Sequence, residues 1–378
     1  MRFFMIYLDN ASTTKPSAAA VAAVTDALEH FGNPSSLHGL GLDGEKIIEK
    51  SRAAVAKALG TDKKSIYFTS GGTEANNLAI FGSAHALKKR GNRIITSAIE
   101  HPSVLESFRA LEKDGFEVVY IGADKNGVIR LDELKSVVDE NTILVSVMTV
   151  NNETGVIQPV REIGEITHKA APAAVFHTDA VQAFGKMNCA PRLTGADLIS
   201  VSSHKIHGPK GAGAVYIGAG KPYPIIFGGS QQGGVRPGTE NVPGIAGFGA
   251  AASEKQGSCE DLYDILKKEI LDGIPDVKIN GDEKFAGKYV LNVSFLGIKA
   301  EVLLHTLERY GIYVSTGSAC SSHKPEPSHV LTAMGLTHRE IEGAVRFSFD
   351  DSLSAADMEE TADVLKKEVA DLRRYMRR

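Results

Sequence analysis

Residues 200–211 read Ser-Val-Ser-Ser-His-Lys-Ile-His-Gly-Pro-Lys-Gly, and this stretch decides the fold that we expect. The run 197–201 is typical of a buried strand, and residues 213–217 are typical of a strand that returns after the Gly-Pro turn. A lysine at a strand end, beside side chains that suit a phosphate, is typical of a Schiff-base lysine. A lysine beside a turn is more often a solvated surface charge, so the interpretation of Lys205 depends on the rest of the chain.

The size and charge of the chain exclude several classes of protein. With 378 residues it exceeds the size of a single hydrophobic core, so two domains are expected. The formal net charge is −4 and both signs are interspersed, which argues against a surface that binds nucleic acid or membrane. The apolar start, residues 1–8, meets Asp9 too early for a signal peptide, and no stretch is long enough to span a bilayer. A cytoplasmic protein is therefore expected.

The three cysteines, Cys189, Cys259 and Cys320, lie far apart and form no CxxC pair. This spacing excludes a disulfide framework and a zinc site made of cysteines, and no metal is expected. Cys189 and Cys259 fit the usual pattern of free cysteines that are buried as small apolar side chains. Cys320 differs, because the polar loop of about 315–327 around it suits a reactive thiolate that must travel.

Strands and helices alternate between residues 66 and 217, which predicts an α/β domain with a mostly parallel sheet. In such sheets ligands bind beyond the carboxyl ends of the strands. The expected strand ends carry Gly72-Thr73, His101, Asn152, Asp179 and Ser202-Ser203-His204-Lys205. Each has a structural explanation of its own, but together they predict one site.

The residue types at these strand ends suit pyridoxal phosphate. Asp179 could hold the proton on the pyridine nitrogen, although an aspartate that caps a helix is the alternative. Gln182 could hydrogen-bond the phenolic oxygen, and His101 could stack on the ring or be a structural residue at a strand end. The glycine turn 70–74 between a strand and a helix could cradle the phosphate, or be a plain turn. Thr73, Ser202 and His204 would hold the phosphate.

Two further residues could contact a substrate. Arg346 lies in the apolar strand 344–349, where a buried arginine needs an anion. A substrate carboxylate would supply that anion, and an internal salt bridge is the alternative. Asn33 in the loop 32–36 could face a ligand or serve only as a turn asparagine.

These motifs closely resemble those of the pyridoxal-phosphate-dependent cysteine desulfurases in the class V aminotransferase superfamily. The motifs that carry the resemblance are 7–14, 32–36, 70–74, 100–101, 150–153, 177–182, 203–205, 236–239, 317–320 and 345–348. The Gly-Ser-Ala-Cys motif in a long loop is similar to the NifS/IscS-like branch with a mobile catalytic loop.

The resemblance implies the aspartate aminotransferase-like architecture, fold type I. A large cofactor-binding domain of residues 16–256 would contain a mostly parallel seven-stranded sheet. Residues 1–15 and 257–378 would form a smaller α+β domain that carries the catalytic loop, about 315–327.

The resemblance also implies a role for each matching residue. Lys205 would carry pyridoxal 5′-phosphate and move protons at Cα, Asp179 would pair with the pyridine nitrogen, and His101 would stack on the ring and assist proton transfer. Gln182 would contact the phenolic oxygen. Gly72, Thr73, Ser202 and His204 would hold the phosphate, with Ser203 beside them and Thr239 reaching over from the other subunit of a homodimer. Asn152 would contact both cofactor and substrate, and Arg346 and Asn33 would hold the substrate.

The implied activity converts L-cysteine to L-alanine. Cys320 would take the sulfur as a persulfide and pass it to an acceptor protein, such as an iron–sulfur scaffold, for iron–sulfur cluster or other thio-cofactor biosynthesis. A selenocysteine lyase, another class V aminotransferase, or a sulfur-delivery protein active only with its partner would share the cofactor motifs. Phe349-Asp350-Asp351 departs from the family's usual Leu-Gly-Arg, so the sequence leaves the acceptor open.

Overall fold

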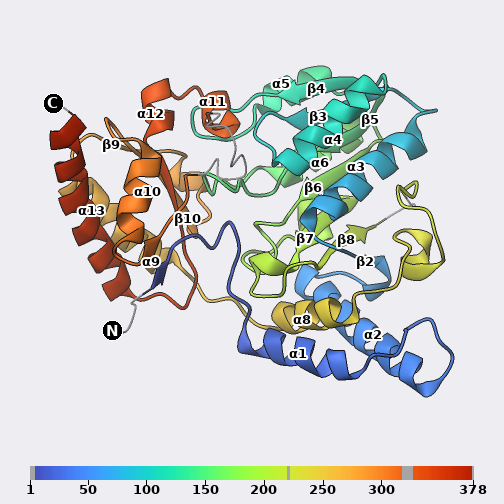
Figure 1. Ribbon diagram of the computed structural model, residues 1–378. Helices are drawn as coiled ribbons and strands as arrows, with labels where there is room; N and C mark the ends of the chain where they lie inside the picture. Colours follow the sequence, from blue (N-terminus) through green and yellow to red (C-terminus); the bar gives the residue numbers. More distant parts are fainter. Residues whose placement is uncertain (1–4, 219–221, 317–326, 377–378) are drawn as a thin grey trace.

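The larger part of the protein is built on a seven-stranded sheet in the order β2-β8-β7-β6-β5-β3-β4 (Figure 1). The computed structural model describes residues 5–218, 222–316 and 327–376. The strands are β2 (Ile66–Thr69), β3 (Arg93–Ser97), β4 (Glu117–Ile121), β5 (Thr142–Ser146), β6 (Val175–Asp179), β7 (Leu198–Ser202) and β8 (Gly213–Ile217). Only β8 runs antiparallel to its neighbours within this sheet. The predicted mostly parallel seven-stranded sheet is confirmed.

Helices cover this sheet and complete the larger part (Figure 1). The connections between strands contain α3 (Gly72–Leu87), α4 (Pro102–Lys113), α5 (Leu131–Val137), α6 (Val160–Ala170) and α7 (Pro191–Thr194). A separate layer consists of α1 (Ala18–Glu29), α2 (Gly39–Leu59) and α8 (Val242–Ser253), in which α1 and α2 each pack on α8. Three short 3₁₀ segments, η1 (Lys63–Ser65), η2 (Ser203–Lys205) and η3 (Gln231–Gly234), occupy the loops.

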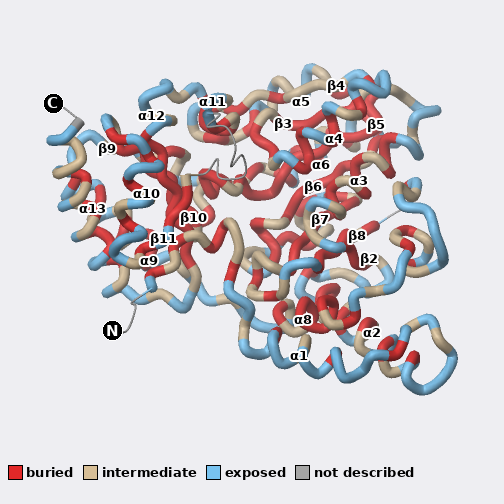
Figure 2. Tube along the Cα trace, in the orientation of Figure 1, coloured by how far each residue is buried: buried red, intermediate tan, exposed pale blue. Residues whose placement is uncertain are grey.

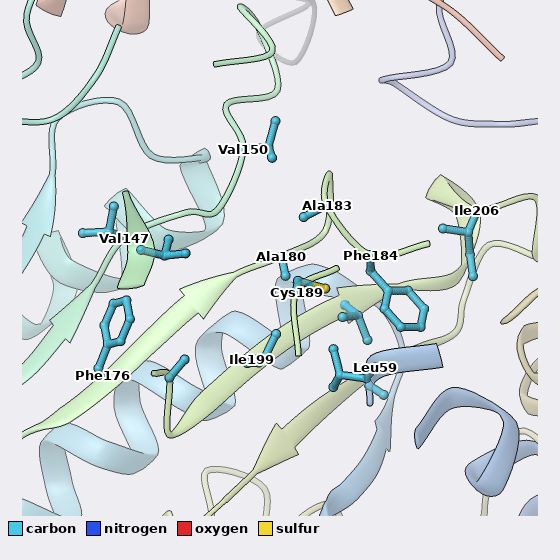
Figure 3. Close-up of a cluster of buried hydrophobic side chains, with 14 of the residues drawn as sticks. Leu59, Val147, Val150, Phe176, Ala180, Ala183, Phe184, Cys189, Ile199 and Ile206 are labelled. Atoms are coloured by element: carbon cyan, nitrogen blue, oxygen red, sulfur yellow. The ribbon is translucent and has the colours of Figure 1, made fainter. Parts of the chain in front are cut away.

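The inner strands of this sheet, from β8 to β3, are largely buried on both faces, and the helices around them are exposed on their outer sides (Figure 2). Every residue of β5 and of β7 is buried. This is the pattern expected of parallel strands between helix layers, since neither face meets water. Figure 3 shows part of the core, where Phe176 on β6, Ile199 on β7 and Phe184 belong to one cluster. The polar strand ends are thereby fixed on a rigid base.

The smaller part contains a three-stranded antiparallel sheet in the order β12-β10-β9 and a parallel pair, β1 and β11. Its strands are β1 (Ile6–Tyr7), β9 (Val277–Ile279), β10 (Val290–Phe295), β11 (Ile312–Tyr313) and β12 (Ala344–Ser348). Its helical segments are α9 (Glu260–Gly273), η4 (Glu283–Phe285), α10 (Ala300–Glu308), α11 (His329–Ala333), α12 (His338–Glu342) and α13 (Ala355–Met376). No helix among the described residues is long and apolar enough to cross a membrane.

The first strand belongs with the C-terminal half of the chain. Ile6 and Leu8 are buried in a cluster that otherwise contains residues from Leu262 to Val369. The strand β1 therefore packs in the core of the smaller part. Val330 on α11 instead belongs to the core of the larger part. The domain bounds at 15/16 and 256/257 stay a prediction.

Candidate active site

A cavity of about 260 Å³ lies beyond the carboxyl ends of the parallel strands. It is lined by most of the residues that the sequence singles out: Gly72, Thr73, His101, Asn152, Asp179, Gln182, Ser202, His204, Lys205 and Arg346. These residues come from six separate stretches of the chain, between Gly72 and Arg346. The structure therefore brings the polar strand ends together, as the topology of the sheet requires.

Three of the predicted residues that the structure describes, Asn33, Ser203 and Thr239, do not line this cavity. Asn33 is exposed and its Oδ1 accepts a hydrogen bond from the Ser35 N–H at 2.9 Å, so it has the role of a turn asparagine. Thr239 is also exposed. Cys320 lies outside the described residues.

Ser203 is fully buried, but it faces away from the cavity. A Cβ atom on Gly208 would lie only 2.1 Å from its Oγ, so that hydroxyl points into the turn behind the lysine. The cause is the alternation of side chains along the end of β7, which sends Ser202 into the cavity and Ser203 to the other side.

Lys205 lies at the end of η2, directly after β7, and its amine is held by two backbone carbonyls. Its Nζ donates to the carbonyl oxygen of Ala11 at 2.6 Å and to that of Ser12 at 2.8 Å. The side chain is half-buried and lines the cavity. The alternative of a solvated surface lysine is therefore wrong.

The segment that supplies these carbonyls is tied to the turn after Lys205. The N–H of Thr14 donates to the His204 carbonyl at 2.9 Å, and the N–H of His207 donates to Thr14 Oγ1 at 2.7 Å. His207 has a φ of 66°, a left-handed conformation that is uncommon outside glycine. These bonds hold the turn in that shape and keep the N-terminal segment against the lysine.

Asp179 is a buried carboxylate whose two oxygens are both hydrogen-bonded. Oδ2 accepts from Asn76 Nδ2 at 2.7 Å, and Oδ1 accepts from the Val181 N–H at 2.9 Å. Asp179 is 5% exposed, and the next helix begins only at Pro191. Its bond to Val181 therefore stabilises a turn and not a helix start. Asn76, on α3, was not expected from the sequence.

His101 is the N-cap of α4 and also a wall of the cavity. The Ser103 N–H donates to its Nδ1 at 3.1 Å, which places the ring proton on Nε2 in the neutral form. Burial lowers the pKa of His101 below its usual value. The capping bond thus fixes the orientation of a neutral imidazole at the cavity, so the structural role of His101 is present and its stacking on the cofactor ring stays a prediction.

One end of the cavity is suited to a phosphate. The helix α3 begins at Gly72 without a side-chain cap, so N–H groups of its first turn remain available. The Ser202 Oγ is buried and has no hydrogen-bond partner among the described residues. Burial and the nearby Lys205 lower the pKa of His204 to about 4, which keeps its imidazole neutral. A buried hydroxyl without a partner beside an open helix start fits the phosphate of pyridoxal phosphate.

Arg346 is 3% exposed and anchors several groups at the cavity. Its Nη2 lies 2.8 Å from Asp9 Oδ1 and 2.6 Å from Ser12 Oγ, and its Nη1 donates to the Asn152 carbonyl at 2.9 Å. Arg346 therefore forms an internal salt bridge with Asp9, which was the alternative to a role in binding a substrate carboxylate. The Arg346 Nε has no partner among the described residues, so part of the guanidinium could still bind an anion.

Glu100, next to His101, is a fully buried carboxyl group. Its Oε1 accepts from Ser97 Oγ at 2.5 Å and from the Met148 N–H at 2.9 Å, while Oε2 has no partner among the described residues. Burial raises the pKa of Glu100 to about 8. Glu100 is therefore a neutral acid at pH 7, and it joins the ends of β3 and β5 without adding charge to the cavity.

The fold and the cavity define a class of protein. A lysine, a buried carboxylate and a phosphate-binding helix start, gathered at the edge of a mostly parallel sheet, are the parts that a pyridoxal-phosphate enzyme requires. Residues 6–360 match the family model for Aminotransferase class-V, and the chain belongs to this family. The members of this family that the chain matches are pyridoxal-phosphate-dependent.

Proteins similar to this chain cover nearly all of it. Cysteine desulfurase IscS of Methanosarcina thermophila is 43% identical over 376 residues, which are 97% of this chain and 93% of that protein. A solved structure described as a NifS-like protein has a TM-score of 0.91 at 36% identity and covers 98% of this chain and 100% of its own. A solved structure of SspA in complex with cysteine has a TM-score of 0.83 at 31% identity, and it covers 92% of this chain and 99% of its own.

We predict that Glu100→Gln changes the pH dependence of stability. The folded-state pKa of Glu100, about 8, lies above the ordinary value of 4.5. Its protonated form therefore contributes stability that is complete below pH 4.5 and is lost as the pH rises to 8. Glutamine mimics the neutral acid and does not titrate. The free energy of unfolding of the variant, relative to that of the wild type, should therefore rise by about 1.4 kcal/mol per pH unit in this window.

The measurement is urea unfolding of the two cofactor-free proteins at pH 5, 6, 7 and 8. The difference in unfolding free energy is compared across pH, because the other titrating groups then cancel. A constant difference would mean that Glu100 is ionised in the folded protein.

Proposed function

We propose that this protein is a pyridoxal-phosphate-dependent cysteine desulfurase, which converts L-cysteine to L-alanine and transfers the sulfur to an acceptor. The observation that carries the proposal is the convergence of Lys205, Asp179 and Ser202 on one cavity. The likeness to cysteine desulfurases along almost the whole chain supports it. The sulfur step distinguishes this activity from that of an aminotransferase, which has no need of a cysteine nucleophile.

The residues around the cavity would hold the cofactor in a defined orientation. Pyridoxal phosphate supplies, when bound, an electron sink that weakens the bonds at the substrate Cα. The Asp179 carboxylate would hold the proton of the pyridine nitrogen, with Asn76 keeping that carboxylate in place. Ser202 and the first turn of α3 would bind the phosphate, and His101 would face the ring.

The proton transfers at the substrate Cα are assigned to Lys205. A neutral amine can accept a proton and return it, and the carbonyls of Ala11 and Ser12 fix the direction of its N–H bonds. His101 is neutral and oriented by its capping bond, so it could assist as a second proton carrier.

Cys320 is the proposed sulfur acceptor within the protein. Its thiolate would attack the sulfur of bound cysteine, the carbon–sulfur bond would break, and Cys320 would carry a persulfide. The carbon fragment would take up a proton and leave as alanine. Cys320 lies outside the described residues, but described residues before and after it in the sequence are held by hydrogen bonds, on one side to Arg346, which lines the cavity. Ser315 exchanges backbone hydrogen bonds with Arg346, and Ser328 Oγ donates to Glu153 Oε2 at 2.5 Å.

The substrate carboxylate is assigned to Arg346, with Asn152 beside it. The Nε–H of Arg346, which has no partner in the described part of the chain, is a donor that an incoming carboxylate could use. Asp9 holds the guanidinium in place by its ion pair. This gives Arg346 two roles, one in binding cysteine and one in fixing the N-terminal segment.

We also propose that the protein is a homodimer in which Thr239 reaches the cofactor site of the partner subunit. Thr239 is exposed and does not line the cavity of its own chain. Phe31 (81%), Leu37 (96%) and Phe227 (74%) are large apolar side chains that are exposed. The loops that carry them lie near Thr239, because Pro34 and Glu240 line one cavity and Gly228 approaches Pro237. Apolar side chains gathered on a surface are typical of an interface between proteins.

The acceptor of the sulfur is proposed to be a protein, such as an iron–sulfur scaffold, and the product to be an iron–sulfur cluster or another thio-cofactor. We also propose a cytoplasmic location, because the attacking cysteine must stay reduced, as thiols do in that compartment.

We predict that Cys320→Ala lowers the rate of alanine and sulfide production from L-cysteine by at least about a hundredfold, because the nucleophile is lost. The visible absorbance of the bound cofactor should stay, since Cys320 is not among the residues that would hold it. Both products are measured with and without a thiol reductant.

The matched control is Cys259→Ala, which removes a half-buried thiol whose pKa is raised to about 11, chiefly by burial. This control should keep full activity. Production of alanine by Cys320→Ala at the wild-type rate would refute the assigned nucleophile.

We predict that Arg346→Ala raises the KM for L-cysteine by about a hundredfold, because a charge-assisted hydrogen bond to the substrate carboxylate is worth up to about 3 kcal/mol. The paired variant is Asp9→Asn, which removes the ion pair of Arg346 but leaves its guanidinium. It should keep or lower the KM. Equal rises in KM in both variants, at unchanged cofactor content, would show that Arg346 has only the structural role.

A further inference from the structure

Lys186 lies next to the active-site cavity, and the proposed reaction has no use for it. Its side chain lines a second cavity of about 220 Å³, which Cys259, Tyr289 and Asp350 also line. Gln182 separates this lysine from the site at Lys205, because Gln182 lines the first cavity and contacts Lys186 with its side chain. Lys186 is thus one hydrogen bond away from the proposed cofactor.

The contacts of Lys186 are unusual for a lysine. Its Nζ donates to Gln182 Oε1 at 3.3 Å and lies 4.7 Å from the ring centroid of Tyr289. It forms no ion pair with any carboxylate in the described part of the chain. Burial, together with the nearby cations Lys205 and Arg346, lowers the pKa of Lys186 to about 7. A lysine in such a costly position calls for an explanation beyond packing.

The two partners of Gln182 fix which way its amide points. An ammonium group only donates hydrogen bonds, so the oxygen of the amide faces Lys186 when this lysine is protonated. A backbone carbonyl only accepts, so the nitrogen must face Ala11, to whose oxygen Gln182 Nε2 donates at 2.9 Å. The same Ala11 oxygen accepts from Lys205 Nζ at 2.6 Å. A continuous chain of hydrogen bonds therefore joins Lys186 to Lys205 through Gln182 and Ala11.

We propose that Lys186 is a positioning residue that holds the amide of Gln182 with its N–H groups toward the cofactor, so that Gln182 donates to the phenolic oxygen of pyridoxal phosphate. The inference rests on the proposed cofactor site. An amide nitrogen has two N–H groups, so one can bond Ala11 while the other serves the cofactor. Without Lys186 only the bond to Ala11 would hold the amide, so rotation that presents its oxygen, which would repel an anionic phenolic oxygen, would be opposed less strongly.

The consequence is a shift in the titration of the bound cofactor. A hydrogen bond donated by Gln182 and the partial positive charge of Lys186 both favour the deprotonated form of the bound cofactor. They therefore lower the pH midpoint of its visible absorbance. Lys186 is in turn influenced by Lys205 and Arg346, which favour its neutral form, and by Asp350, which favours its charged form. The face of the Tyr289 ring also favours the charged form.

We predict that Lys186→Met raises the pH midpoint of the visible absorbance by roughly half a unit to one unit, because both favourable effects are lost. Lys186→Arg, which keeps the charge and the donors, should stay near the wild-type midpoint. The matched control is Lys288→Met, which removes a lysine of the same second cavity whose Nζ pairs with Asp264 at 2.7 Å. That control should leave the midpoint unchanged.

A double-variant comparison separates positioning from a simple charge effect. In a Gln182→Leu background, the further change Lys186→Met should shift the midpoint by less than about a third of its effect in the wild type. An equal shift in both backgrounds would overturn the proposal, and so would an unchanged midpoint in Lys186→Met alone.

Cofactor content and melting temperature are measured for each variant. If Lys186→Met does not fold, Lys186→Gln takes its place, with the same rise expected and the same unchanged midpoint contradicting it. A wild-type protein that shows no visible absorbance with pyridoxal phosphate would refute the proposed function, which is a separate result from the absence of a shift.

Discussion

The hydrogen bonds from Lys205 Nζ to the carbonyls of Ala11 and Ser12 are the interaction on which the site depends. These carbonyls lie on a segment that leaves β1 in the smaller part and crosses to α1 in the larger part (Figure 1). At one end Asp9 pairs with Arg346, and at the other Thr14 bonds to the turn after the lysine. One short segment thereby fixes the two parts of the protein around the reactive amine.

The ionisable groups near the lysine are held mainly in their neutral forms. Burial lowers the pKa values of His101 and His204 and raises that of Glu100. Desolvation disfavours the charged form in each case, so the same physical cause acts in opposite directions on bases and on an acid. The two histidines therefore add no positive charge beside Lys205 in their resting form, and the neutral imidazole of His101 can accept a proton. The cavity is therefore suited to chemistry that moves protons.

The sequence predicts much of this arrangement, because parallel strands bring their polar carboxyl ends to one edge. Asp179 and Lys205 could be found in that way, since each follows a buried apolar strand. Ala11 and Ser12 could not, because they act through backbone carbonyls, which leave no trace in residue type. Ser203 shows a further limit: in a run of polar residues, the alternation of side chains decides which of them faces the cavity, and the run does not indicate where that alternation starts.

The most direct test of the account is to locate the cofactor on the chain. Reduction of the holoenzyme with borohydride makes the bond between lysine and pyridoxal phosphate permanent, and peptide mapping by mass spectrometry then identifies the labelled residue. The account predicts the phosphopyridoxyl group on Lys205, whose amine is oriented by the carbonyls of Ala11 and Ser12. A label on Lys186 or Lys210, or no label on any lysine, would contradict it.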